Sequence, residues 1–279
     1  MVEATACPDR LTVSLLQVAS PPDEPKADRI ERVRAWLMDL APADLVVLPE
    51  TWATGFDAIE NCHSEAEPED GPTVTMCRAV ARQRGIHLAM GSFLARGPDG
   101  LIRNTALLLG PDGQVVHRYN KIHLFPKPSR EAELLTPGDT ISVAPLPWGG
   151  YATATCYDIR FPGLWLELGR RGADLVVLPA AWPVSRLEHW LALTKARAIE
   201  SQIFLLACAA TGLPDATGAM AGLGCGHSRV VDPFGRILGE LGSEQAELRL
   251  TLDRSTIDQV RAKLPVRTSA LPSYSTLSN

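Results

Sequence analysis

Hydrophobic residues fall in short runs along this chain, and longer segments with helical spacing lie between the runs. The apolar runs at residues 11–18, 44–48 and 87–93 are short and rich in branched side chains, so they predict buried strands. Residues 28–40 and 74–84 carry apolar side chains three or four positions apart, which is typical of helices that cover one face of a sheet. Strands that alternate with helices predict an α/β protein.

Two segments predict β-hairpins. Within residues 104–119, the extended runs TALLL and QVVHRY flank the turn sequence Pro-Asp-Gly. Within residues 226–241, SRVVD and RILGEL flank Pro-Phe-Gly. Turn residues between two extended runs indicate antiparallel strands joined by a tight connection.

The second half of the chain repeats the first in outline. The sequence ADLVVLP occurs at residues 43–49 and again at 173–179, and each copy is followed by one of the two hairpins. Two matches in the same order predict two similar α/β halves. Each half has an apolar sheet face to bury, and packing these faces together predicts a four-layer αββα sandwich.

The join between the halves does not resemble a linker. Residues 136–150 hold several prolines and glycines but also a plausible strand at 141–144. We therefore predict one domain over residues 1–265. The tail at 266–279 is rich in Ser, Thr and Pro, and we interpret it as an extended arm or, equally, as a frayed terminus.

Composition and charge exclude several classes of protein. The chain is 46% hydrophobic and 21% charged, as in ordinary globular proteins, and its net charge is −5 without a basic stripe of the kind that binds nucleic acid. No apolar stretch approaches the roughly 18 residues of a membrane span, and the N-terminus lacks the basic-then-apolar order of a signal peptide. We expect a cytoplasmic protein with no nucleic-acid or membrane partner.

The cysteines are scattered and form no C-x-x-C pair, which favours reduced thiols over a disulfide framework. They are Cys7, Cys62, Cys77, Cys156, Cys208 and Cys225. The pairs Cys62-His63 and Cys225-Gly226-His227 each lack the convergent second pair that tetrahedral zinc requires. We therefore expect no metal site.

Cys156 is a candidate nucleophile. It ends the run YATATC and precedes a helical pattern at residues 161–171. Backbone N–H groups near the positive end of a helix lower the pKa of a thiol and can bind an oxyanion. The alternative from the residues alone is a buried structural cysteine.

Glu50 and Lys121 are candidates for supporting that chemistry. Glu50 stands at the carboxyl end of the strand LVVLP, where the repeat has Ala180, so the architecture does not require the carboxylate. It suits a general base, or else a cap after the strand. Lys121 follows the first hairpin among apolar residues, and the second hairpin has no such lysine. It suits oxyanion stabilisation, or else a surface position.

Together these segments resemble the nitrilase superfamily of carbon–nitrogen hydrolases. The motifs are LVVLPE at residues 45–50, YNKIHLF at 119–125 and CYDIRFP at 156–162, in the order and at the spacings of that family. The segments NTALLLGPDG, LLTPGD, AAWP and KARAIE extend the likeness over roughly residues 11–255. The resemblance implies an αββα sandwich and no metal or organic cofactor.

The resemblance also implies a mechanism. Glu50 would take the proton of the Cys156 thiol, and the thiolate would attack an amide carbon. Lys121 and the backbone N–H of Tyr157 would hold the oxyanion. Ammonia would leave, and water activated by Glu50 would hydrolyse the thioester.

A second glutamate of the site is implied as well. The family has it near the LLTPGD segment, where Glu131 lies eight residues before Asp139. Its role there would be to position the lysine and the substrate. Glu133 competes for the assignment, and the spacing favours Glu131.

The wording of the motifs is most similar to the omega-amidase and Nit-type branch, whose enzymes hydrolyse the terminal amide of small dicarboxylate monoamides, such as 2-oxoglutaramate, or deaminated glutathione. Such a substrate requires a cation, for which Arg160 is a candidate unless it forms a structural ion pair. Phe56 and Trp182 lie just beyond the two sister strands and either line the pocket or pack as ordinary aromatics.

Three residues depart from that branch. Ser201 and Cys208 stand where Asn is usual, and Cys225 lies in a loop that we expect to face the pocket. These departures leave the substrate open. A nitrilase or an N-carbamoyl amino acid hydrolase with the same triad is the first alternative, and a non-catalytic binding member of the family is the second.

The family also implies a homodimer formed through helices near the nucleophile. Residues 186–200 are the segment that we expect to contribute. Its apolar candidates for the interface are Leu187, Trp190, Leu191 and Leu193.

Overall fold

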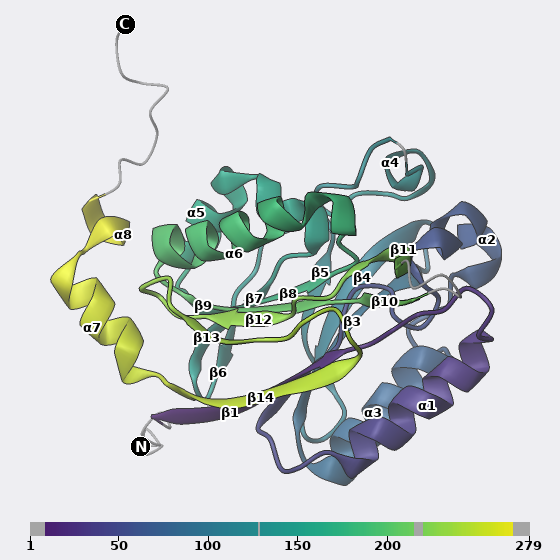
Figure 1. The fold of residues 1–279 in the computed structure, drawn as a ribbon, viewed down its shortest axis with the longest axis horizontal. Coiled ribbons are helices and arrows are strands. Elements are labelled where there is room, and N and C mark those ends of the chain that lie inside the picture. The colour runs from purple at the N-terminus through teal and green to yellow at the C-terminus, as the bar shows by residue number, and fades with distance from the viewer. Residues whose placement is uncertain (1–8, 128, 215–219, 270–279) are drawn as a thin grey trace, which may run out of the picture.

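Two six-stranded sheets face each other, and helices cover their outer faces (Figure 1). The computed structural model describes residues 9–127, 129–214 and 220–269. The strand order is β14-β1-β2-β3-β4-β5 in the first sheet and β13-β12-β9-β8-β7-β6 in the second. The predicted four-layer αββα sandwich is thus confirmed.

The first sheet comes from the first half of the chain, apart from one edge strand. Its strands are β1 (Arg10–Gln17), β2 (Leu45–Val47), β3 (His87–Arg96), β4 (Ile102–Leu109), β5 (Val115–Asn120) and β14 (Ala246–Asp253). Its outer face is covered by α1 (Lys26–Asp39) and α3 (Pro72–Arg84), and the shorter helices are η1 (Phe56–Asn61), α2 (Cys62–Glu65) and α4 (Glu131–Leu134). The predicted strands, helices and hairpin of this half are confirmed.

The second sheet repeats this arrangement. Its strands are β6 (Ala144–Leu146), β7 (Gly149–Thr153), β8 (Ala173–Ala180), β9 (Phe204–Ala209), β12 (Arg229–Val231) and β13 (Ile237–Glu240). The outer helices are α5 (Pro162–Arg170) and α6 (Leu187–Ser201), preceded by the single turns η2 (Cys156–Arg160) and η3 (Val184–Arg186). β10 (Thr211–Pro214) and β11 (Met220–Cys225) form a separate ribbon, and α7 (Ser255–Lys263) and α8 (Val266–Ser269) follow β14.

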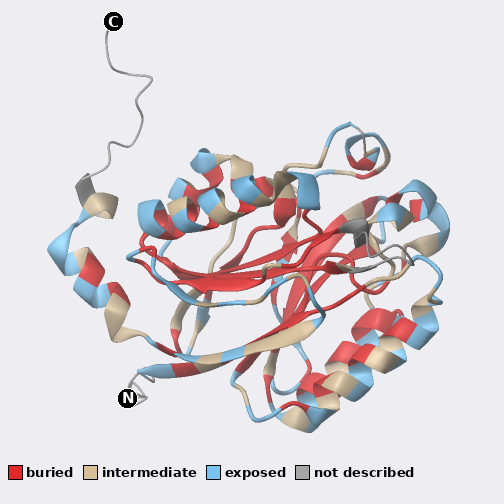
Figure 2. Ribbon diagram, in the orientation of Figure 1, coloured by how far each residue is buried: buried red, intermediate tan, exposed pale blue. Residues whose placement is uncertain are grey.

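The main core lies between the sheets, and a further apolar layer lies under each helical face (Figure 2). Val13, Leu15 and Val47 of the first sheet pack in one cluster with Val177 and Leu206 of the second. The two copies of ADLVVLP therefore form facing central strands, because both faces of these strands are buried. This packing brings the carboxyl ends of β2 and β8 together.

The edge strands next to β1 and β7 have different origins. β6 directly precedes β7, whereas β14 returns from the end of the second half and pairs antiparallel with β1 along its whole length, from Arg10–Asp253 to Gln17–Ala246. The internal repeat does not predict this exchange. It covers the edge of the first sheet and ties the two halves into one unit.

Three expectations are wrong in detail. The strand expected at 141–144 lies three residues later as β6, because Ile141 and Val143 pack against the core under α5 and α6. The expected arm begins as α8, directly after Pro265, which is pre-organised for a helical start; its remainder, 270–279, is outside the described residues. Trp190, expected at a subunit interface, is fully buried, and its indole nitrogen donates to the carbonyl of His227 (2.9 Å).

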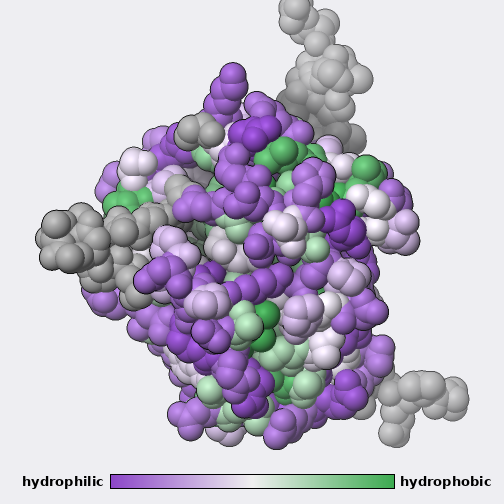
Figure 3. Space-filling view, turned by 90° about the vertical axis from the view of Figure 1, so that its right-hand side faces the viewer, coloured by the Kyte–Doolittle hydropathy of each residue, from purple (hydrophilic) through white to green (hydrophobic). Residues whose placement is uncertain are grey.

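The surface carries no sign of a bilayer-spanning element. In the three described ranges, no helix is long and apolar enough to cross a membrane. On the face drawn in Figure 3, apolar residues form small separate patches among hydrophilic ones. Such a distribution is usual for a surface in contact with water.

A glycine in β3 permits the close approach that places the end of β2. Gly91 has a φ of +70°, and a Cβ there would lie 1.9 Å from the carbonyl oxygen of Pro49, the residue before Glu50. The next residue, Ser92, accepts a hydrogen bond at Oγ from the N–H of Thr51 (3.2 Å). The β3 backbone thus supports both neighbours of Glu50.

Gly91→Ala should therefore lower the free energy of unfolding by about 3 kcal/mol or more, from left-handed strain and the backbone clash together. Gly100→Ala is the matched control, because Gly100 also has a positive φ (+77°) but open space around it. It should cost about 1 kcal/mol. Urea unfolding of both variants measures the difference, and equal losses would contradict the close-contact argument.

Candidate active site

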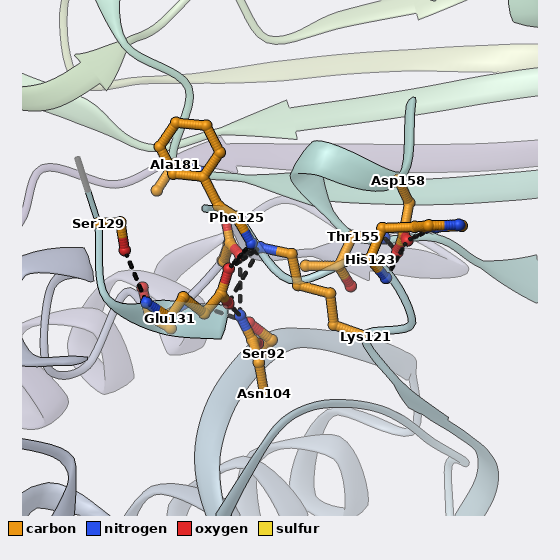
Figure 4. A network of polar contacts seen from close by, with 12 residues as sticks. Ser92, Asn104, Lys121, His123, Phe125, Ser129, Glu131, Thr155, Asp158 and Ala181 are labelled. Atoms are coloured by element: carbon orange, nitrogen blue, oxygen red, sulfur yellow. Dashed lines mark hydrogen bonds and ion pairs between the residues drawn. The ribbon is translucent and has the colours of Figure 1, made fainter. Parts of the chain in front are cut away.

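The predicted catalytic residues converge at the carboxyl ends of strands from both sheets. Glu50 follows β2, Lys121 follows β5, and Cys156 follows β7, while Glu131 opens α4. Because the sheets face each other, the N–H of Ala181, just after β8, reaches Glu50 Oε2 (2.8 Å). The structure thus brings together residues that are up to 106 positions apart (156 − 50) in the sequence (Figure 4).

Lys121 lies between two carboxylates. Its Nζ is 2.8 Å from Glu50 Oε1 and 2.8 Å from Glu131 Oε2, and all three side chains are inaccessible to solvent. Burial alone would lower the pKa of Lys121, but the charges of Glu131 and Glu50 raise it well above its ordinary value. The lysine is therefore a buried ammonium and not a surface residue.

Asn104 joins the two carboxylates from the other side. Its Nδ2 donates to Glu50 Oε1 and to Glu131 Oε1, both at 2.8 Å. The sequence analysis treated this residue only as the start of a hairpin strand. The available signal was a polar amide at the start of an apolar run, in a strand that must be buried.

The structure also separates the two candidates for the second glutamate. Glu131 is buried, and its Oε2 accepts a further bond from the N–H of Phe125 (2.7 Å). Glu133 is on the exposed side of α4, where it pairs with Arg130 (3.1 Å). Glu131 thus belongs to the cluster and Glu133 does not.

The backbone is strained beside the two reactive groups. Cys156 has a φ of +46°, and Thr51, the residue after Glu50, has a φ of +44°. Residues other than glycine rarely occupy this region, and a β-branched residue there is a clear outlier. Strain of this kind, held by surrounding structure, occurs preferentially at functional sites.

The Cys156 thiol is held in its protonated form. Burial and the negative charge of Glu50 raise the pKa of Cys156 well above its ordinary value, while the Lys121 ammonium and the Ala181 N–H act in the opposite direction. The expectation that the helix start lowers this pKa is therefore wrong, because burial and the carboxylate outweigh the local N–H groups. A thiolate forms only if a base removes the proton, and Glu50 is the adjacent carboxylate.

A buried carboxylate connects the lysine segment to the cysteine turn. Asp158 Oδ2 accepts bonds from the N–H of Thr155 (2.9 Å) and the hydroxyl of Tyr119 (2.7 Å). Its Oδ1 accepts the N–H of His123 (3.0 Å) and lies 2.7 Å from the Nδ1 of the same residue. Asp158 was missed as a site residue, although it lies within the motif CYDIRFP.

The predicted substrate-binding residues share a pocket with the cysteine. The lining residues are Phe56, Phe125, Cys156, Tyr157, Arg160, Ala181, Trp182, Pro183 and Arg186. A second, more polar pocket lies on the Glu50 side and shares Phe56 and Ala181 with the first. Arg186 was not expected from the sequence, and Arg160 makes no structural ion pair with any described residue.

The departures from the branch pattern lie outside the lining of both pockets. Ser201 Oγ donates to the carbonyl of Trp165 (3.1 Å), and Cys208 lies between the sheets, where its thiol donates to the carbonyl of Leu16 (3.3 Å). Cys225 donates through its backbone N–H to the carbonyl of Trp182 (2.7 Å). The expectation that these residues change polar groups of the pocket is wrong, because their side chains make structural contacts.

No group of three or more potential metal ligands occurs among the residues that the structure describes. The site chemistry therefore rests on the cysteine, the two carboxylates and the ammonium. These groups together can transfer a proton, supply a sulfur nucleophile and stabilise a negative oxygen.

Replacing Lys121 should expose the cost of its two buried carboxylates. Lys121→Met should lower the free energy of unfolding by about 3–5 kcal/mol at pH 8, because it leaves buried charge without its partner. The folded-state pKa of Lys121 is raised above an unfolded value of about 10.4, so the stabilisation is complete below that pH and is lost only as the pH rises through the folded value. The gap should therefore be equal at pH 7 and pH 9.

Lys26→Met is the control for this experiment, because Lys26 pairs with Glu67 at 3.3 Å but is one-quarter exposed. It should cost less than about 1 kcal/mol. Urea unfolding of both variants at the two pH values measures the gaps. Equal losses for the two lysines would show that the buried cluster contributes nothing special to stability.

The chain is similar to carbon–nitrogen hydrolases along most of its length. The family model described as "Carbon-nitrogen hydrolase" matches residues 12–262. The 2-oxoglutaramate amidase of Paenarthrobacter nicotinovorans is 36% identical over 265 residues, which cover 92% of this chain and 88% of that protein.

Solved structures share the fold. Nit3 of Saccharomyces cerevisiae, a member of branch 10 of the nitrilase superfamily, has a TM-score of 0.82 and 25% identity, covering 98% of this chain and 99% of that one. An amidase from Nesterenkonia sp. AN1, solved with the acetamide moiety of fluoroacetamide added covalently at its active site cysteine, has a TM-score of 0.77 and 28% identity, covering 91% and 95%. The chain therefore belongs to the carbon–nitrogen hydrolase family, within the nitrilase superfamily.

Proposed function

We propose that this enzyme is a cysteine-dependent amidohydrolase that converts the terminal amide of a small carboxylate-bearing substrate to an acid and ammonia through a thioester. The observation that carries the proposal is the buried cluster of Glu50, Lys121 and Glu131 beside Cys156, in a pocket that also holds arginines. The similarity to a 2-oxoglutaramate amidase supports the substrate class.

In the first half-reaction Glu50 removes the proton of Cys156, and the thiolate attacks the amide carbon. The Lys121 ammonium and the backbone N–H of Tyr157, in the first turn of η2, stabilise the oxyanion. The carbon–nitrogen bond then breaks, and the leaving nitrogen takes the proton from Glu50 to depart as ammonia. The acyl group remains on sulfur as a thioester.

In the second half-reaction water replaces the thiol. Glu50 removes a proton from water as the oxygen attacks the thioester carbon, and the proton returns to the sulfur when the carbon–sulfur bond breaks. Glu131 and Asn104 keep the ammonium and Glu50 in place throughout. The covalent adduct at the active site cysteine of the Nesterenkonia amidase supports a sulfur-bound intermediate.

The proposal includes a cytoplasmic homodimer. Five buried free cysteines favour a reducing compartment: Cys62, Cys77, Cys156, Cys208 and Cys225. The outer helical layer near Cys156 exposes Leu166 (38%) and Ile199 (47%), which suit an apolar interface better than the buried Trp190.

Ammonia release from a substrate panel tests the proposed reaction. The panel holds succinamate, 2-oxoglutaramate, deaminated glutathione, an aliphatic nitrile and an N-carbamoyl amino acid. We expect release from the first three, and Cys156→Ala should abolish it. Cys208→Ala, which removes a buried thiol between the sheets, should retain turnover.

Turnover of only the nitrile or the carbamoyl compound would keep the cysteine chemistry but overturn the substrate class. Full activity in the Cys156→Ala variant would contradict the mechanism. Silence across the whole panel from folded protein would favour a binding protein.

Glu131→Gln should lower kcat by about tenfold or more, because Lys121 loses one of its two carboxylates and the oxyanion its correctly placed ammonium. Glu133→Gln is the matched control two residues away and should leave kcat unchanged, because Glu133 is exposed. Steady-state kinetics on the best substrate compare the two. A larger loss from the Glu133 variant would overturn the assignment.

Sedimentation equilibrium at micromolar concentration tests the oligomeric state. We expect a mass of twice 30.1 kDa, and Ile199→Glu should shift the protein toward the monomer by placing charge in the interface. A wild-type monomer would contradict the dimer.

A further inference from the structure

Two arginines line the pocket beside Cys156 without a carboxylate partner. Arg160 ends η2 and Arg186 ends η3, so they come from different segments. Among the described residues neither forms an ion pair. The fully buried arginines of the described chain do pair with glutamates, as Arg29–Glu24, Arg197–Glu200 and Arg229–Glu240.

Aromatic rings hold both guanidinium groups in place. The Cζ of Arg160 lies 4.7 Å from the centre of the Trp182 ring, and the Cζ of Arg186 lies 5.3 Å from that of the Phe125 ring. The Trp182 indole nitrogen also donates to the carbonyl oxygen of Arg186 (2.7 Å), so one tryptophan connects the two arginines. A ring face orients a guanidinium but leaves its N–H donors free for a planar anion.

The two charges act on each other. Burial and, next, the charge of Arg186 lower the pKa of Arg160. Arginine nevertheless stays charged in proteins, so the pocket holds two like charges at close range. A bound anion would remove this repulsion, and a carboxylate matches the geometry of the guanidinium fork.

The wall between the arginines and the cysteine is aromatic. Phe125 contacts Phe56 edge-on at 6.5 Å between ring centres and Tyr157 at 5.2 Å. Such a wall suits the methylene chain of a short substrate, with a charged group at one end and an amide at the other.

We propose that Arg186 is a specificity-determining residue that, together with Arg160, clamps the carboxylate of the substrate and thereby sets the amide carbon at Cys156. This inference rests on the proposed amidase function. It assigns to the η3 turn a binding role that the catalytic cluster does not require. It also predicts that the enzyme prefers a carboxylate over a neutral group of the same size.

A matched pair of substrates tests the clamp. Glutaramate carries one carboxylate and one amide, and glutaramide replaces the carboxylate by a second amide of nearly the same shape. Arg186→Met should raise KM for glutaramate by about 10–100-fold, the loss expected when a buried charge contact is removed, with kcat within about threefold. The KM for glutaramide should not change.

Arg160→Met should show the same selective effect, and Arg186→Lys, which keeps the charge but loses the planar fork, should recover part of it. Arg34→Met is the control, because Arg34 lies exposed on α1 and pairs with Glu31. It should alter neither substrate. Circular dichroism and thermal unfolding establish that each variant is folded.

Several results would overturn the inference. An equal rise of KM for both substrates would show a structural role for Arg186, and no change for either would show that it contacts no carboxylate. Calorimetric binding of glutarate to the Cys156→Ala protein separates the clamp from turnover. If wild-type enzyme hydrolyses neither amide but glutarate binding still depends on Arg186, the proposed reaction fails while the clamp stands; loss of that dependence overturns the clamp.

Discussion

A lysine ammonium with no access to water governs this structure. Removing such a charge from solvent is expensive, and it persists only where carboxylates and hydrogen bonds compensate it. Lys121 has two such carboxylates, and Asn104 contacts both of them. The segments after β2 and β5 and the helix α4 must therefore meet at one place, whatever else the chain does. Cys156 is placed beside a charge arrangement that the fold already requires.

Rigid elements hold this arrangement from several directions. Gly91 allows the backbone of β3 to approach the end of β2 closely, and Ser92 then bonds the residue after Glu50. Asp158 connects the lysine segment to the cysteine turn through four contacts. A site built on strand ends and supported in this way retains its geometry more precisely than one built on free loops. The left-handed backbone of Cys156 is tolerated because these contacts determine it.

The charges are divided between two regions of the site. The compensated cluster of Glu50, Lys121 and Glu131 lies at the sulfur and serves proton transfer and the oxyanion. The uncompensated arginines lie across the aromatic wall, where a substrate supplies the missing negative charge. Binding and chemistry therefore use different cations, so a change in one need not disturb the other. The raised pKa of Cys156 fits this division, because the thiol stays protonated until Glu50 accepts the proton.

The sequence by itself determined the elements and the identity of the reactive residues. Apolar periodicity and turn chemistry are local properties, so the strands, the outer helices, both hairpins and the repeated central strand were predictable. The three motifs that contain Glu50, Lys121 and Cys156 were also visible as an ordered set. Only the tertiary structure decided which distant groups meet. It placed β14 in the first sheet, joined Asn104 and Asp158 to the site, separated Glu131 from Glu133 and brought Arg186 beside Arg160. It also reversed the expected shift of the thiol pKa. These outcomes depend on burial and on charges that lie far apart in the chain, and no local pattern of residues contains that information.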